Sequence, residues 1–254
     1  MTASLKPFVF AWQFLTAIPL SRELHKPAPE ELAGSMFWYP FVGILIGALL
    51  AVTDLLLAPW LSREVTVTLL IVLLVGVTRG LHQDGLADTL DGLAGGRTSS
   101  DRLTIMRDPR IGALGATGLF LSLIMRYSAL VSLPEALRVP ILLCMPAIGR
   151  WGMVFSAYGA IYARAEGGLA APFLAHLSRR HVVGATVVVG AVMVWSYGAT
   201  TALAALIIGG IVSRLTTLFC HYYFGGITGD TLGATNEVVE ISFLLLMPLL
   251  TSLS

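Results

Sequence analysis

Seven stretches of the chain are apolar over lengths that suit a membrane span. A helix needs about 20 apolar residues to cross the hydrocarbon core of a bilayer, which is about 30 Å thick. The windows lie at residues 36–58, 64–81, 112–133, 139–160, 181–199, 201–222 and 240–253. The last one is short unless its helix begins obliquely near residue 232. A polytopic helical membrane protein is predicted, because each spanning helix satisfies its own backbone hydrogen bonds.

The connections between these windows predict one all-α integral-membrane domain over residues 1–254, with six or seven transmembrane helices and no internal repeat. The second window either ends near residue 81 or continues into the polar residues as one long helix. The run from Pro7 to Ala17 is too short to span, and no small-residue cleavage site follows it. An interfacial helix is therefore predicted there in preference to a cleaved signal peptide. Short cytoplasmic helices are expected to hold the polar motifs.

Composition supports the membrane class. Hydrophobic residues make up 56% of the 254 residues and charged residues only 12%, too few polar residues to cover a soluble domain of this size. The net charge of +1 gives no indication of a nucleic-acid partner. Cys144 and Cys220 lie in apolar runs and are expected to be buried free thiols.

Lys and Arg are distributed unequally between the two sides of the predicted bundle. Ten of the sixteen lie on one side: Lys6, Arg22, Lys26, Arg97, Arg102, Arg107, Arg110, Arg164, Arg179 and Arg180. Only Arg63 and Arg138 lie on the other side, and the remaining four are in spans or at their ends. Because positively charged loops stay in the cytoplasm, the N-terminus and all the polar motifs are predicted to face the cytoplasm.

The polar stretch at residues 80–110 concentrates charge, with five of the fifteen acids and four of the sixteen bases. Asp84, Asp88 and Asp91 stand at i, i+4 and i+7, on one stripe of a helix, where they repel one another unless a cation lies between them. Small or apolar residues separate them, so we predict a Mg²⁺ site in preference to a solvated acidic face. His82 is a candidate to accept a proton or hold a phosphate, with an interfacial residue as the alternative.

Basic side chains follow the acidic helix. The glycines at 95–96 are expected to break it, and a short helix is predicted from a cap at Thr98 or Ser99 to Asp108. Four arginines lie on this helix or flank it: Arg97, Arg102, Arg107 and Arg110. Guanidinium groups beside a carboxylate–metal site suit a diphosphate, although arginines on this side also serve as ordinary membrane anchors. Asp108 is either a fourth metal ligand or an ion-pair partner.

Two further motifs fall on the same predicted side. Residues 162–164 add one more cation, Arg164. Residues 225–234 are glycine-rich and open into the last helix, where backbone N–H groups can receive an anion. Within this motif, Asp230 and Thr231 are expected to contact the substrate.

Glu237 and Glu240 follow at i, i+3 in the first turns of the last span. Acidic side chains at such a depth need partners. We predict that they bind substrate or a second metal. The alternative is that they pair with Arg150 or Arg214 from neighbouring spans.

These motifs together resemble the cobalamin synthase family, the membrane adenosylcobinamide-GDP ribazoletransferases, over essentially the whole chain. The matching segments are His82-x-Asp84-Gly85-Leu86-Ala87-Asp88-Thr89-x-Asp91-Gly92, Ile105-Met106-Arg107-Asp108-x-Arg110-x-Gly112, Pro40-Phe41-Val42-Gly43, Tyr162-Ala163-Arg164-x-Glu166-Gly167 and Gly225-Gly226-x-Thr228-Gly229-Asp230-Thr231-Leu232-Gly233-Ala234 with Glu237 and Glu240. One departure is Gly149-Arg150, where the family pattern has Ser before the Arg.

The resemblance implies a Mg²⁺-dependent phosphoryl transfer that completes the nucleotide loop of cobalamin. A ribose hydroxyl of α-ribazole, or of its phosphate, would attack the cobinamide-side phosphorus of adenosylcobinamide-GDP and displace GMP. Asp84, Asp88 and Asp91 would hold the metal, and the proton acceptor stays open between His82, Asp91 and Asp108. The phosphate-binding candidates are Arg97, Arg102, Arg107, Arg110 and Arg164. The location implied is a prokaryotic inner membrane, with the lipid bilayer as surroundings and a homo-oligomer as a possible state.

Two other classes share features with the chain. A CDP-alcohol phosphotransferase of phospholipid synthesis also uses membrane-embedded aspartates, and Asp84-Gly85-x-Ala87 matches part of its motif, but Asp88 stands where that motif has Arg. An ion-coupled transporter would place acids at mid-membrane in repeated, broken helices. Here the acids cluster toward one side, so both alternatives are less favoured.

Overall fold

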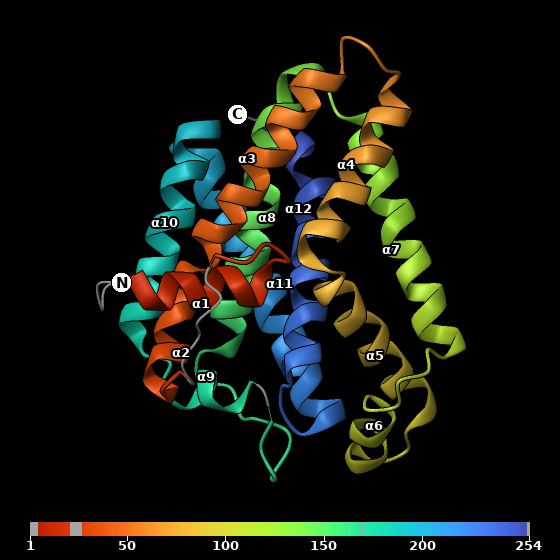
Figure 1. Cartoon of the computed structure of the whole chain (residues 1–254), viewed down its shortest axis with the longest axis vertical. Helices are drawn as coiled ribbons and strands as arrows, with labels where there is room; N and C mark the ends of the chain where they lie inside the picture. The colour runs from red at the N-terminus through yellow and green to blue at the C-terminus, as the bar shows by residue number, and fades with distance from the viewer. Residues whose placement is uncertain (1–4, 21–26, 169, 253–254) are drawn as a thin grey trace.

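The computed structural model describes residues 5–20, 27–168 and 170–252, which fold into helices joined by short loops (Figure 1). The elements are α1 (Lys6–Leu15), α2 (Pro29–Ser35), the 3₁₀ turn η2 (Met36–Trp38), α3 (Tyr39–Leu57), α4 (Arg63–Thr78), α5 (Leu81–Gly95), α6 (Ser99–Ile105), α7 (Ala113–Ser132), α8 (Glu135–Ala157), α9 (Ala171–Ala175), α10 (Arg179–Tyr197), α11 (Ala199–Phe224) and α12 (Gly229–Ser252). Within the described ranges, the extended pairing is limited to an isolated bridge between Tyr162 and Ile227. The all-α prediction is confirmed.

In the described part of the chain, six helical segments are long and apolar enough to cross a membrane. They are α2 with α3, α7, α8, α10, α11 and α12. The helices α4 and α5 pass the same test only as a bent pair, which raises the number to seven if the pair counts as one span. This confirms a polytopic protein with six or seven spans. The last helix starts at Gly229, well before the predicted window, because the residues just before it cap its first turn.

A sharp bend separates α4 from α5. The two helices meet at 85°, because Arg79 and Gly80 both have positive φ, at 56° and 66°. Glycine adopts this conformation readily, whereas it is strained for arginine. The bend is tied to the N-terminal region, since Arg79 donates to the carbonyl of Gln13 at 3.3 Å and the Ala17 N–H donates to the Val77 carbonyl at 2.6 Å. The alternative of one long helix through this region is therefore wrong.

A second break follows α5. The helix ends at Gly95, as the glycine pair predicts. Thr98 then caps α6: its Oγ1 accepts from the Asp101 N–H, and its own N–H donates to Asp101 Oδ2, both at 3.1 Å. The predicted end at Asp108 is wrong, because α6 stops at Ile105. The Asp108 N–H instead donates to the Ile105 carbonyl at 2.9 Å, in a tighter turn that closes the helix.

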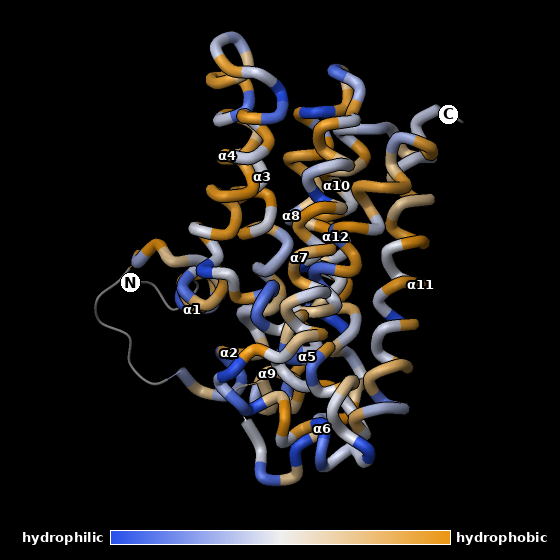
Figure 2. Tube along the Cα trace, turned by 90° about the vertical axis from the view of Figure 1, so that its right-hand side faces the viewer, coloured by the Kyte–Doolittle hydropathy of each residue, from blue (hydrophilic) through white to orange (hydrophobic). Residues whose placement is uncertain are grey.

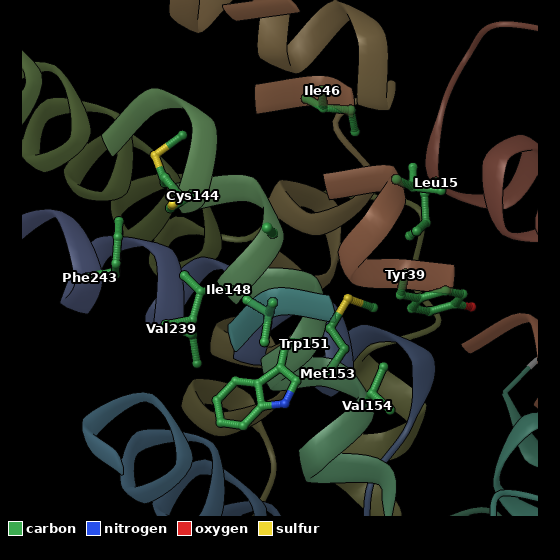
Figure 3. Packing of buried hydrophobic residues seen from close by; sticks show 14 of the residues in the cluster. Leu15, Tyr39, Ile46, Cys144, Ile148, Trp151, Met153, Val154, Val239 and Phe243 are labelled. Carbon is green, nitrogen blue, oxygen red and sulfur yellow. The ribbon is translucent and has the colours of Figure 1, made fainter. Parts of the chain in front are cut away.

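Helix α8 forms the centre of the bundle. All its residues from Cys144 to Val154 are buried, and Figure 3 shows Ile148 beside Val239 of α12. Helix α3 approaches α8 closely, because a Cβ at Gly43 would lie only 2.4 Å from a carbonyl oxygen of α8. Such small residues permit close helix packing where lipid supplies no hydrophobic driving force. Both cysteines are buried and free, as predicted.

Apolar side chains cover the outside of the bundle, as expected for a surface in contact with lipid. On α11, a row of exposed apolar residues repeats at helical spacing and each is more than half exposed: Leu203, Ile207, Ile211, Leu215 and Leu218. Hydrophilic segments surround α6 and the loop after α8 at one end of the molecule (Figure 2). In Figure 1, α1 lies across the direction of the spans, an arrangement that suits the predicted interfacial helix.

Candidate functional site

The polar motifs, far apart in the sequence, meet at one end of the molecule. Helices α5 and α6, the loop after α8 and the start of α12 lie together there (Figures 1 and 2). Glycines let α5 and α12 approach closely. A Cβ at Gly85 would lie 2.6 Å from the Asp230 carbonyl oxygen, and one at Gly233 would lie 3.3 Å from the Cα of His82. This packing brings the acidic stripe of α5 beside the first turn of α12.

Asp84 and Asp88 have unpaired carboxylates. Asp84 is exposed and Asp88 is half-buried, and neither forms a hydrogen bond or an ion pair with a described residue. The nearby carboxylates of Asp91 and Asp230 add like charge at Asp88, while Arg164 supplies opposite charge. Negative charge is therefore left uncompensated, which favours a bound cation.

Asp91 does not join this pair. Its two oxygens accept the backbone N–H groups of Gly112 and Gly115, each at 2.7 Å. These donors belong to the start of α7, where a helix has free N–H groups and the positive end of its dipole. In the described part of the chain, no group of three or more His, Cys, Asp or Glu side chains is placed to hold a metal ion. The predicted triad is not found among the described residues, because Asp91 caps α7. Its role as a proton acceptor stays a prediction.

The two free carboxylates still form a suitable donor set for Mg²⁺. This ion is usually bound by one or two carboxylates, with waters and substrate phosphates completing its octahedral shell. Asp84 and Asp88 lie one helical turn apart on α5. The negative charge of Asp230 acts on both carboxylates. The donor set therefore fits a Mg²⁺ ion whose remaining ligands would be waters or phosphate oxygens.

Two of the predicted arginines line a polar cleft of about 350 Å³ between α6 and the loop after α8. Arg107 donates to Oε1 of Glu166 at 2.6 Å, and Arg164 donates to Oδ2 of Asp230 at 3.3 Å. The backbone bridge between Tyr162 and Ile227, just before α12, holds the loop after α8 in place. The Arg107–Glu166 pair is 51% and 60% exposed. Exposed pairs of this kind are weak, so the Arg107 guanidinium is available to phosphate oxygens, whereas the Arg164 side chain is only 13% exposed in its pair with Asp230.

The other three predicted arginines have different surroundings. Arg102 donates to the Tyr223 carbonyl at 2.9 Å and stacks over its ring at 5.2 Å, so it ties α6 to α11, and its contact with phosphate stays a prediction. Arg110 donates twice to Asp108, at 2.9 and 2.7 Å, and these bonds lower the pKa of Asp108 to about 2. A carboxylate with so low a pKa is a weak base. The ion-pair alternative for Asp108 is confirmed, and its role as proton acceptor is corrected. Arg97 is exposed at the turn after α5.

Thr231 forms part of a helix cap. Its Oγ1 accepts the Thr228 N–H at 2.8 Å, while Thr228 Oγ1 accepts the Thr231 N–H at 3.2 Å. The Thr231 side chain is also buried. Thr231 thus has a structural role in the cap, and its contact with substrate stays a prediction. Asp230 stays at the site, because its side chain is 31% exposed and pairs with Arg164.

Glu237 and Glu240 lie in a buried ion-pair network inside the bundle. Arg126 contacts Glu237 at 2.9 Å and Glu240 at 2.6 Å, and Arg150 pairs with Glu240. All four side chains are 1% exposed. Two acids and two bases make the network neutral, as a buried set of charges requires. The predicted pairing with Arg150 is confirmed. Arg214 lies elsewhere, with its guanidinium on the Tyr158 carbonyl and over the Phe155 ring, so that alternative is wrong. Contact of the two glutamates with substrate or a second metal stays a prediction.

His82 lies against this network and away from the acidic stripe. Its side chain is 1% exposed, with Nδ1 3.4 Å from Nη2 of Arg150. Its neighbour Gln83 donates to Oε1 of Glu237 at 3.1 Å. The His82 side chain is thus enclosed among protein groups, and its catalytic role stays a prediction. The inner side of α5 joins the network, and the outer side presents the free acids.

Arg126, the residue that contacts both glutamates, is not among the residues predicted for the site. The available signal was an ionisable residue within an apolar window, which needs a partner. One turn earlier, Ser122 donates to Oε2 of Glu237 at 3.2 Å. Such a signal predicts that Arg126 is paired but does not identify its partner.

Fold and site together define a polytopic helical membrane protein with an acidic, arginine-flanked site at one end, suited to a phosphate-bearing substrate. The chain belongs to the cobalamin-5-phosphate synthase family, whose profile matches residues 7–248. The family predicted from the motifs is thus confirmed, and the chain is an enzyme of this family.

Three relatives illustrate the similarity, each named adenosylcobinamide-GDP ribazoletransferase. The protein of Syntrophobacter fumaroxidans is 40% identical over 219 residues, covering 85% of this chain and 87% of the relative. That of Ectopseudomonas mendocina is 37% identical over 243 residues, covering 94% and 97%. That of Desulforamulus reducens is 36% identical over 239 residues, covering 93% and 94%. No solved structure matches the chain significantly.

Proposed function

We propose that this enzyme joins adenosylcobinamide-GDP to α-ribazole, or to α-ribazole phosphate, with release of GMP. The names of its relatives supply the two substrate classes. The observation that supports the proposal is the pair of free carboxylates, Asp84 and Asp88, close to a cleft lined by Arg107 and Arg164. Transfer at a diphosphate requires a cation and guanidinium groups at one place.

The proposed reaction forms one phosphorus–oxygen bond and breaks another. A ribose hydroxyl oxygen of the acceptor attacks the cobinamide-side phosphorus and loses its proton to water. The bond from this phosphorus to the bridging oxygen breaks, and GMP leaves with that oxygen and the electron pair. Arg107 and Arg164 bind non-bridging oxygens, and Asp230 orients Arg164. Asp84 and Asp88 hold Mg²⁺, which neutralises charge on the diphosphate when bound.

We place this site on the cytoplasmic side of a prokaryotic inner membrane. Ten of the sixteen Lys and Arg residues fall on the side of the polar motifs, although Arg22 and Lys26 lie outside the described residues. On the opposite side, Arg63 begins α4, and Arg138 is neutralised by a buried pair with Asp54. The positive charge that retains loops in the cytoplasm is therefore concentrated on the side of the site, and the lipid bilayer surrounds the spans.

The decisive experiment measures GMP released by the purified protein from adenosylcobinamide-GDP and α-ribazole in the presence of Mg²⁺. We expect Asp84→Asn and Asp88→Asn each to lower the rate by about 100-fold or more, because each removes a carboxylate from the metal site. Glu64→Gln is the matched control, since Glu64 is an exposed acid in the first turn of α4. Full activity in both Asp variants would overturn the metal assignment.

The same assay separates the proposed substrates from the lipid alternative. CDP-diacylglycerol replaces adenosylcobinamide-GDP as the nucleotide donor, and CMP is measured in place of GMP. Product from the lipid donor alone would overturn the proposed function. Product from adenosylcobinamide-GDP alone would support it.

A further inference from the structure

A second cleft, of about 610 Å³, is lined by residues of α4, α5 and α7. Its walls are largely apolar and include Val75 of α4 with Leu119 and Leu123 of α7. Asp84 of α5 lies among these apolar side chains. The volume is typical of a pocket for one small ligand.

Asp84 makes this cleft unusual for a surface that merely faces lipid. An ionised carboxylate beside apolar walls in a membrane protein is unfavourable unless a partner or a ligand accompanies it. No described residue pairs with Asp84. Arg79 lines the same cleft, but its guanidinium donates to the Gln13 carbonyl at 3.3 Å. The cleft therefore suits a ligand that combines an apolar ring with a polar group near Asp84.

The two neighbouring clefts suit other partners. The cleft of about 350 Å³ contains Arg107 and Arg164 and is suited to phosphates. A cleft of about 710 Å³ at the start of α7 contains Asp91 and Asp108, whose carboxylates are already paired with backbone N–H groups or with arginine. Only the cleft between α4, α5 and α7 combines apolar walls with a free carboxylate among these three.

We propose that this cleft binds the aromatic base of the nucleoside acceptor. The inference rests on the proposed function, in which α-ribazole supplies the attacking hydroxyl. Its flat, methylated benzimidazole base matches the walls formed by Val75, Leu119 and Leu123, and its ribose then lies at Asp84. The phosphate-binding arginines are in a different cleft. Acceptor and donor phosphates thus occupy separate clefts, with Asp84 in the wall of the acceptor cleft, and the corrin ring of the donor, far larger than this cleft, stays outside it.

The test places a bulky side chain in the cleft. Leu119 and Leu123 are one helical turn apart on the same face of α7, whereas Leu121 points away and is 51% exposed. In Leu119→Trp and Leu123→Trp, we expect the KM for α-ribazole to rise about tenfold or more, the size of effect that a changed apolar contact has on discrimination. The KM for adenosylcobinamide-GDP should change by less than about twofold. Leu121→Trp adds the same bulky side chain outside the cleft and should leave both KM values unchanged.

A binding measurement separates this inference from the proposed function. α-Ribazole alone, without donor or Mg²⁺, should quench the fluorescence added by Trp at 119 or 123 and not that added at 121, relative to the unsubstituted protein. Leu123→Ala, which enlarges the cleft, should also raise the acceptor KM and covers the case in which a Trp variant does not fold. An unchanged acceptor KM in folded 119 and 123 variants, or equal quenching at all three positions, would overturn the cleft assignment. If wild-type protein releases no GMP, the proposed function fails, while quenching restricted to 119 and 123 still supports the cleft.

Discussion

Arg126→Met tests whether charge balance stabilises the buried network. The Arg126 guanidinium contacts Glu237 at 2.9 Å and Glu240 at 2.6 Å, and all three side chains are 1% exposed. Methionine preserves much of the apolar volume but leaves two carboxylates with Arg150 alone, so the formal charge of the network falls from zero to −1. Removing one partner of a buried ion pair costs about 3–5 kcal/mol, because it leaves an uncompensated buried charge.

The assay is thermal unfolding of the detergent-solubilised protein. In proteins of about this size, 1 kcal/mol shifts Tm by about 2–4 °C, so the loss predicts a Tm lower by about 6–20 °C. The double variant Arg126→Met/Glu237→Gln removes one charge of each sign and restores neutrality. We expect its loss of stability to be smaller than the sum of the losses in the single variants Arg126→Met and Glu237→Gln by about 0.5–3 kcal/mol, the usual range of coupling between contacting residues.

A remote buried pair provides the matched control. Arg138 pairs with Asp54 between α8 and α3, with side chains 7% and 3% exposed. Arg138→Met should destabilise the protein comparably yet leave GMP release per folded molecule intact. Wild-type stability in Arg126→Met would refute the charge-balance reasoning. A loss of stability in the double variant equal to the sum of the losses in Arg126→Met and Glu237→Gln would refute it as well.

Two further predictions concern the site. Gly85→Ala should lower GMP release by about tenfold or more, because the new Cβ would lie 2.6 Å from the Asp230 carbonyl oxygen and force α5 away from α12. Gly76→Ala, with nothing within 4 Å of its Cβ, is the control, and equal activity in the two variants would contradict the packing argument. Asp108→Asn should leave the pH profile of GMP release unchanged between about pH 5 and pH 8, because Arg110 holds the Asp108 pKa at about 2 and the carboxylate stays ionised throughout this range. A displaced acid limb in that variant would return Asp108 to the list of proton acceptors.

Local sequence patterns predicted the parts of the site that depend on neighbouring residues. The acids at i and i+4 lie on one helix, and the glycine pair ends that helix where expected. The role of Asp91 could not be predicted in this way, because it depends on α7 beginning beside α5, 21 residues further along the chain. The pairing of Arg126 with Glu237 joins residues 111 positions apart. Charged residues on three spans, α7, α8 and α12, could pair with one another. Only the packing of these spans determines which pairs form.

The apolar windows predicted the spans for a similar reason, since span length is a local property. The bend before α5 is different. One glycine, Gly80, is the only local signal, and a single glycine is tolerated in a helix at a cost of about 1 kcal/mol. The positive φ of Arg79 coincides with a contact to Gln13 in α1. Choosing between a bend and one long helix therefore required the tertiary structure.

The bend at Arg79 and Gly80 also sets the direction in which the helix with the free acids leaves α4. Helix α1 lies across the spans (Figure 1), and the Gln13 carbonyl and the Ala17 N–H contact the bend at Arg79 and the end of α4 at Val77. The start of α5 is thus tied to the N-terminal segment as well as to the spans. In a thicker or thinner bilayer, spans tilt to match the hydrocarbon. We expect such a tilt of α4 to move Asp84 and Asp88 only as far as this tie to the N-terminal segment allows.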